Sequence, residues 1–206
     1  MSPYSKLCSV DQESSSDNLL KPVFQKMSDY QFITEDLAKK TNKEFFILGD
    51  TAYFRKPKSV TSEVITLEYG LNLLAFRRQS DYLHCKVIAG SYDKKEQKAI
   101  TSELEVKNSD TQTAVLSAAP LEISIQEDAE TEAELKTRVE EIGRQKIDKV
   151  QGGRGKCIGI PEIVPGRYIK LDKLDSDANQ KYYIVEVRHH FGEEGYYTEF
   201  ETEGWI

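Results

Sequence analysis

Residues 151–156, with the sequence QGGRGK, have the composition of a phosphate-binding loop. In such a loop a strand comes first, a helix follows, and Ser or Thr comes directly after the lysine. Here the patterns predict a helix before this stretch and a strand after it, and Cys157 follows Lys156. The pair Gly152 and Gly153 is more typical of a helix end followed by a turn, so we predict no cofactor site here.

Two of the three histidines, His189 and His190, are neighbours in a stretch that predicts a β-strand. Their side chains then point to opposite faces and cannot bind one metal ion together. His84 is far from both in the sequence. We therefore predict no metal site, and expect one of the neighbouring pair to lie in the core with its ring hydrogen-bonded.

Acidic residues are numerous, and Glu193 and Glu194 lie together in a predicted turn. A glycosidase needs two carboxylates in a cleft, one of them with a raised pKa, and no spacing here indicates such a pair. A nucleophile elbow of the form Gly-x-Ser-x-Gly is missing from the sequence, as is a recognisable Ser/His/Asp or Cys/His set. We predict no catalytic residues and no enzymatic activity.

The composition is that of an ordinary soluble protein, with 38% hydrophobic and 31% charged residues and a net charge of −7. The acidic total argues against a general nucleic-acid binder, although Arg77–Arg78 and 154–156 are short basic patches. Cys8, Cys85 and Cys157 are odd in number and lack metal-like spacing, which favours reduced, partly buried thiols in a cytosol. Neither a signal peptide nor an apolar run of about 20 residues is visible.

The first 60 residues predict a small α/β unit. Residues 1–18 are polar and predict a flexible arm. Ser28 and Gln31 form a capping box, and the apolar spacing after it predicts a helix over 29–40. Gly49-Asp50 between two aromatic runs predicts a hairpin of 44–48 and 51–55. We assign the unit to 19–58.

Residues 59–206 predict a β-rich domain. A capping box at Thr131 and an apolar stripe predict one long helix over 131–150, closed by Gly152-Gly153. Alternation and turn signals predict strands over 63–69, 71–76, 82–92, 98–104, 121–125, 168–172, 182–190 and 196–202. The last three should form a meander. The fold class is therefore α+β and mainly antiparallel β, with one packed helix.

Two blocks of motifs also resemble one protein family. The first comprises Val-Phe-Gln at 23–25, Ser-Asp-Tyr-Gln-Phe-Ile at 28–33, Phe-Phe at 45–46, Gly-Asp at 49–50 and Tyr-Phe-Arg-Lys-Pro at 53–57. The second comprises Gly-Ile-Pro at 159–161, Pro-Gly-Arg at 165–167, Tyr-Ile-Val at 183–185 with a strand ending in His, and Gly-Tyr-Tyr-Thr-x-Phe at 195–200. Together they resemble the C-terminal part of phage late control protein D, the baseplate hub, and its VgrG-type relatives in contractile injection systems.

This resemblance covers about residues 19–206 and implies a tail-tube-like β-barrel. It implies a homotrimeric hub that links tail tube to spike and lines the channel through which DNA or effector proteins leave. Such a protein would be made in the bacterial cytoplasm and assembled into a virion tail or injection particle. Family members usually carry a further barrel before the Ser28 block, so we expect this chain to match part of a hub.

Two alternatives stay open at this point. One is a stand-alone binding or adaptor module for carbohydrate or protein, which would use exposed rings such as Tyr196 and Tyr197. The other is a peptidoglycan hydrolase associated with a tail.

Overall fold

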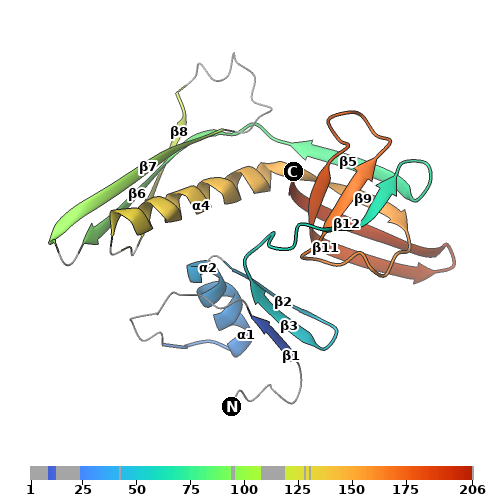
Figure 1. Cartoon of the computed structure of the whole chain (residues 1–206), viewed down its shortest axis with the longest axis horizontal. Coiled ribbons are helices and arrows are strands. Elements are labelled where there is room, and N and C mark those ends of the chain that lie inside the picture. The colour runs from blue at the N-terminus through green and yellow to red at the C-terminus, as the bar shows by residue number, and fades with distance from the viewer. Residues whose placement is uncertain are drawn as a thin grey trace. The chain divides into compact units, whose positions relative to one another are not determined.

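A computed structural model describes residues 9–12, 24–41, 43–93, 96–107, 119–127, 129 and 131–205. The chain divides into two compact units, Met1–Val60 and Thr61–Ile206 (Figure 1). The predicted α+β class with a majority of β structure is confirmed. The assignment of functional domains to 19–58 and 59–206 stays a prediction.

The first unit combines one helical stretch with a small sheet. The helical stretch runs through α1 (Asp29–Gln31), η1 (Phe32–Leu37) and α2 (Ala38–Thr41), and Ser28 caps its start as predicted. Its middle is a π-helix where we predicted an α-helix. The backbone N–H of Ala38 donates to the Ile33 carbonyl, five residues back, which is the hydrogen bond of a π-helix.

The predicted hairpin is confirmed as β2 (Glu44–Leu48) and β3 (Thr51–Arg55), with Gly49 at a φ of 57° in the turn. The predicted flexible arm is wrong for β1 (Ser9–Gln12), which pairs in parallel with β3. All of its side chains are exposed, so the strand lacks the alternation of apolar and polar residues by which strands are predicted from a sequence. Backbone pairing alone explains it. Residues 1–8 and 13–18 of the predicted arm lie outside the described residues.

A six-stranded sheet dominates the second unit, and we call it the half-barrel. Its strands lie in the order β4 (Glu63–Glu68), β10 (Tyr168–Asp172), β11 (Lys181–Gly192), β12 (Gly195–Trp205), β9 (Gln151–Ile158) and β5 (Leu73–Ser80). The meander of β10, β11 and β12 is confirmed, and only β4 and β10 pair in parallel. A closed tube-like barrel stays a prediction.

The half-barrel curls because its two outermost strands are consecutive in the chain. Residues 69–72 alone join β4 to β5, so the two ends of the sheet must meet at this corner. Tyr69 and Leu73 form an isolated bridge there. The curl encloses a core from all six strands and the 159–167 connection, with these buried members: Leu67, Leu73, Cys157, Ile160, Ile163, Ile169, Leu171, Tyr182, Ile184 and Phe200.

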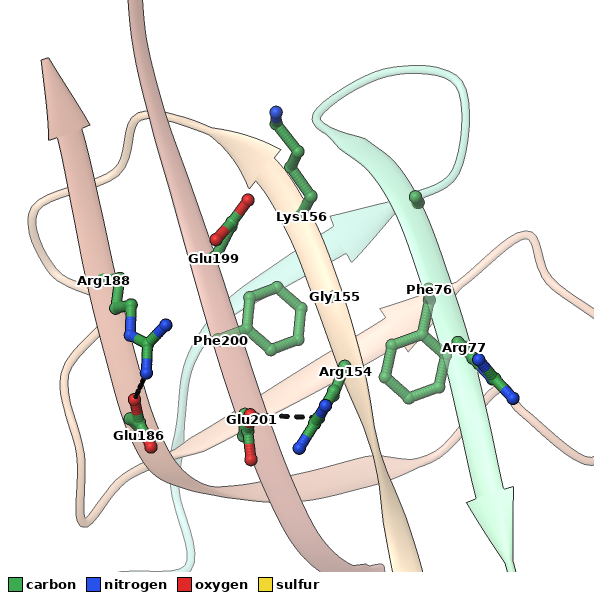
Figure 2. Close-up of a pocket in the computed structure, with 11 residues that line it drawn as sticks. Phe76, Arg77, Arg154, Gly155, Lys156, Glu186, Arg188, Glu199, Phe200 and Glu201 are labelled. Atoms are coloured by element: carbon green, nitrogen blue, oxygen red, sulfur yellow. Dashed lines mark ion pairs between the residues drawn. The ribbon is translucent and has the colours of Figure 1, made fainter.

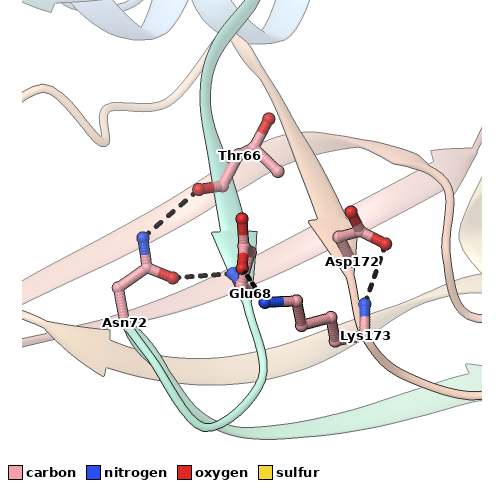
Figure 3. Close-up of polar contacts among 5 residues, drawn as sticks. All are labelled: Thr66, Glu68, Asn72, Asp172 and Lys173. Carbon is pink, nitrogen blue, oxygen red and sulfur yellow. Dashed lines mark hydrogen bonds and ion pairs between the residues drawn. The ribbon is translucent and has the colours of Figure 1, made fainter.

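Asn72 fastens this corner (Figure 3). Its side-chain Oδ1 accepts from the backbone N–H of Glu68 at 2.6 Å, and its Nδ2 donates to the Thr66 carbonyl at 3.3 Å. The amide therefore replaces a neighbouring strand along the outer edge of β4. The Asn72 carbonyl also accepts from Ile158 of β9 at 3.0 Å, so one residue connects β4, at one end of the sheet, to β9, the strand next to the other end.

A second sheet is covered by the long helix. It has the order β7 (Lys98–Lys107), β6 (His84–Asp93) and β8 (Leu121–Gln126), with β6 and β8 parallel. Helix α4 (Glu132–Val150) buries Leu135, Val139 and Gly143 against this sheet, and Thr131 caps it as predicted. The predicted loop at 108–110 lies outside the described residues.

The predicted glycine stop after α4 is wrong. The last helical residue is Val150. The C-cap residue Gln151 is already extended, with a φ of −121°, and is the first residue of β9. Gly152 and Gly153 lie inside this strand. Their role is close approach, since a Cβ at Gly152 would lie 2.0 Å from the Thr202 carbonyl oxygen of β12.

Candidate functional site

The outer surface of β11, β12, β9 and β5 carries a hollow of about 400 Å³ (Figure 2). Neighbouring strands bring Glu186, Glu201, Arg154 and Arg77 into one row across the sheet. The second row, two residues along, holds Arg188, Glu199, Lys156 and Ala75. We call these two rows the charged face.

The floor of the hollow is backbone, because the row between the two charged rows points inward. Phe200 is buried, and its ring lies directly over Gly155 of the neighbouring strand. A Cβ at Gly155 would lie 2.2 Å from that ring. Phe76 packs against Tyr182 and Phe200 with ring centroids 5.0 and 6.5 Å away. Glycine in β9 thus makes room for aromatic side chains of the core.

The acids of the charged face each lie against a basic side chain. Arg154 Nε is 3.0 Å from Glu201 Oε1, and Arg188 is 2.7 Å from Glu186 (Figure 2). Glu199 Oε2 lies 3.2 Å from a ring nitrogen of His190. The charged face thus sets acids beside bases across four strands, and this arrangement suits electrostatic recognition of a partner.

The structure excludes the phosphate-loop alternative for residues 151–156. These residues form β9, an inner strand that pairs with β12 on one side and β5 on the other. Their backbone groups are used by the sheet, so they do not form the anion-binding turn of a phosphate loop. The two predicted basic patches do meet, because Arg77 is the register partner of Arg154, but they lie among Glu186, Glu199 and Glu201.

The neighbouring histidines lie on opposite faces of β11, as predicted, but neither lies in the core. His189 is exposed, with Nδ1 3.0 Å from both the Thr198 hydroxyl and the Tyr196 hydroxyl. His190 is half-buried and stacks on Tyr197 at 4.5 Å. Our placement was wrong because β11 at this point has run past β10, which pairs only with Lys181, Tyr182 and Tyr183.

The buried histidine is His84, which no sequence pattern had singled out. Its Nε2 lies 2.9 Å from Glu105 Oε1 across β6 and β7. This hydrogen bond lowers the pKa of the Glu105 carboxyl below its ordinary value. Among the described residues no group of three or more His, Cys, Asp or Glu side chains could hold a metal ion.

Two of the cysteines are fully buried. Cys85 belongs to the core under α4 and Cys157 to the core of the half-barrel, and both are free thiols. Burial raises the pKa of Cys157 to about 12, so this thiol is inert. Cys8 lies outside the described residues.

The two tyrosines that we considered for sugar binding have covered rings. Tyr196 lies over the backbone of Gly159 and stacks on Phe191 at 4.2 Å. Tyr197 packs against His190, and Lys156 Nζ lies 3.6 Å from its ring centroid. Glu193 and Glu194 are exposed in the turn between β11 and β12 and are not among the residues that line the hollow. None of the helices described is long and apolar enough to cross a membrane.

Sequence reasoning missed the charged face as a unit. The alternation of acids and aromatics in β12 was visible, and so were both basic patches. What could not be read was the register that places Glu201 between Glu186 and Arg154. Register joins segments that are more than 40 residues apart, such as 154 and 201.

Comparison with known proteins decides the family. The family model of the Alg8 N-terminal domain matches residues 7–193, which is most of the chain. The chain belongs to the Alg8 N-terminal domain family. Among curated proteins no sequence matches it significantly.

Solved structures give this member of the Alg8 N-terminal domain family a phage tail-type fold. A tail protein from Neisseria meningitidis MC58 is similar over 98% of this chain and 63% of its own, with a TM-score of 0.73 and 12% identity. The 43 kDa tail protein of prophage MuSo2 from Shewanella oneidensis is similar over 95% and 58%, with a TM-score of 0.66 and 11% identity. A chain from the virion of a native gene transfer agent particle is similar over 82% and 37%, with a TM-score of 0.52 and 13% identity. This chain thus spans about three-fifths of the length of the two tail proteins.

Proposed function

We propose that this chain is a structural component of a contractile phage tail or a phage-like injection machine. Its place would be the baseplate hub, where it links the tail tube to the spike and lines the exit channel. The observation that carries the proposal is the likeness of nearly the whole chain to a tail protein from Neisseria meningitidis MC58, with a TM-score of 0.73. The motif blocks that resemble late control protein D and VgrG-type hubs support the finer assignment.

The geometry of the half-barrel fits assembly into a ring. Strands β4 and β5 are edge strands, with no further strand on their outer sides among the described residues. Asn72 covers only the end of the β4 edge, at Thr66 and Glu68, and among the described residues no strand lies beside the part from Glu63 to Ile65. An edge of this kind is stable when a neighbouring subunit covers it, and we propose a homotrimer closed in this way.

The chemistry fits a passive conduit. A channel that releases DNA must not bind phosphate strongly, and the net charge of −7 satisfies this condition. We propose that DNA or effector proteins pass without specific binding, and that the chain uses no cofactor. After synthesis in the bacterial cytoplasm it would join a virion tail or injection particle together with tube and spike proteins.

The other two functions have less support. The carboxylates of the hollow are already engaged by Arg154, Arg188 and His190, which disfavours a hydrolase because its acids must contact the substrate. A sugar-binding module needs free aromatic faces, and the rings of Tyr196 and Tyr197 are covered. We therefore propose a role without enzymatic activity.

Immuno-electron microscopy of particles from the producing bacterium tests this function. An antibody against the chain should label one end of each tail, beside the spike, and label should be lost when the gene is deleted. Label along the whole tail, or a chain found only outside particles, would contradict the hub assignment. Clearing of purified cell walls by the chain would support the hydrolase instead.

A further inference from the structure

The first row of the charged face has an order of charges that a two-fold rotation preserves. From β11 to β5 it reads Glu186, Glu201, Arg154, Arg77, which is two acids followed by two bases. If the row is read from the other end and each acid is replaced by a base and each base by an acid, the order of charges is unchanged. In the second row the central pair, Glu199 and Lys156, has the same property.

This order makes the surface complementary to itself. Consider two copies face to face about an axis that runs along the strands between β12 and β9. Glu201 of each copy then lies opposite Arg154 of the other, and Glu186 lies opposite Arg77. A two-fold interface uses one patch on both subunits, so only a self-complementary patch can form it. Facing two copies in this way produces opposite charges at every position of the first row.

An apolar pair lies beside the charged rows. Tyr197 and Ile158 are register partners on β12 and β9, and Lys156 lies over the Tyr197 ring, which places the pair on the charged face. Ile158 is 45% exposed. The same axis brings Ile158 of each copy opposite Tyr197 of the other, where it meets the Lys156 side chain that covers the ring. Apolar burial would contribute affinity, while the charges would fix the register.

We propose that the charged face binds a second copy of this chain, face to face about a two-fold axis. The hollow of about 400 Å³ between the two rows gives the long Arg and Glu side chains of the other copy room to enter. This contact is separate from the proposed trimer, which uses the strand edges.

Charge reversal of Arg77 and Glu186 tests the proposal by sedimentation velocity of the full chain. Both side chains are exposed, and within the described part of the chain Arg77 makes no ion pair. The unmodified chain should form a dimer that weakens as salt rises. Arg77→Glu alone and Glu186→Arg alone should each weaken self-association about tenfold or more, because like charges then face each other.

Mixing gives the decisive arm of the experiment. The two single variants should associate with each other, since the acid introduced at position 77 of one chain then faces the base introduced at position 186 of the other. A chain carrying both changes should self-associate again. Lys136→Glu changes the net charge by the same amount as Arg77→Glu, but on an exposed part of α4, and should leave self-association unchanged. Thermal unfolding should show all variants folded.

Several outcomes would overturn the proposal. These are a chain that stays monomeric at every concentration, single variants that associate like the unmodified chain, or single variants that fail to recover when mixed. A trimer unaffected by any of these changes would support the proposed function and overturn the two-fold contact. A salt-sensitive dimer that recovers on mixing, without any trimer, would support the two-fold contact and contradict the proposed trimer.

Discussion

The half-barrel and the helix-covered sheet each bury a hydrophobic cluster, but their glycines meet different neighbours. In the half-barrel, a Cβ at Gly152 would meet the backbone of β12 at 2.0 Å, and one at Gly155 would meet a buried ring at 2.2 Å. Under α4, a Cβ at Gly143 would meet only methyl groups of Leu104 and Val106, at 2.8 and 3.0 Å. The half-barrel therefore depends on close backbone approach, whereas the helical layer depends on side chains that can repack.

The largest expected effect is that of Gly152→Ala. Because the new methyl group would overlap a backbone carbonyl, β9 and β12 would have to separate, and we expect a loss of about 3 kcal/mol in the free energy of unfolding. Urea unfolding followed by tryptophan fluorescence would measure it. Gly90→Ala in β6 is the control, since nothing lies within 4 Å of its Cβ position, and we expect a change of about 0.5 kcal/mol or less. Equal losses for both variants would contradict the comparison.

The next effect is that of Asn72→Ala at the corner of the half-barrel. Removing the amide leaves the Glu68 N–H and the Thr66 carbonyl without their side-chain partner, at a cost of about 2 kcal/mol. Asn179→Ala is a matched control, because Asn179 makes the same pair of bonds to Leu174 in an exposed loop. The control should lose less than half as much, and hydrogen exchange at Glu68 should accelerate only in Asn72→Ala. A control that lost more would show that the corner is unimportant.

High pH should weaken the half-barrel through Cys157. The folded chain holds this thiol proton up to a pKa of about 12, while the unfolded chain releases it near 9. Stability from this group is therefore complete below about pH 9 and is lost as pH rises toward 12. Between pH 8 and pH 10 we expect the free energy of unfolding to fall by about 1 kcal/mol more in the unmodified chain than in Cys157→Ala. Parallel pH profiles for the two proteins would refute this.

The smallest expected effect is that of Gly143→Ala in α4. The substitution gains about 1 kcal/mol of helix propensity, and the displacement of Leu104 and Val106 side chains offsets part of it. We expect the midpoint of thermal unfolding to move by only a few degrees in either direction. A loss as large as that of Gly152→Ala would remove the distinction between the two regions.

The helical layer could be predicted because its signals are local. Thr131 and Glu134 mark the start of α4 within four residues, and the apolar stripe follows from Leu135 and Val139. The hairpin at Gly49 is equally local. These elements were correct, and so were most strand positions.

The half-barrel could be predicted only in its strands, and one of these, β9, was missed. The order β4-β10-β11-β12-β9-β5 joins segments far apart, and nothing within β9 shows that it separates β12 from β5. We interpreted Gly152 and Gly153 as a helix end because the rings and carbonyls that require glycine lie on other strands. The charged face could not be predicted for the same reason, because its two rows can be identified only when the register between the strands is known.

Helix α4 enters β9 without a loop, and this has a mechanical consequence. A load on the helix is delivered at Gln151 to a strand held by ladders of hydrogen bonds on both sides. Pulled along its length, such a strand must break many bonds at once, whereas a hairpin pulled from its end breaks them one by one. The junction at residue 151 would therefore transmit tension and resist being peeled away, and force spectroscopy on α4 should show a single high rupture event.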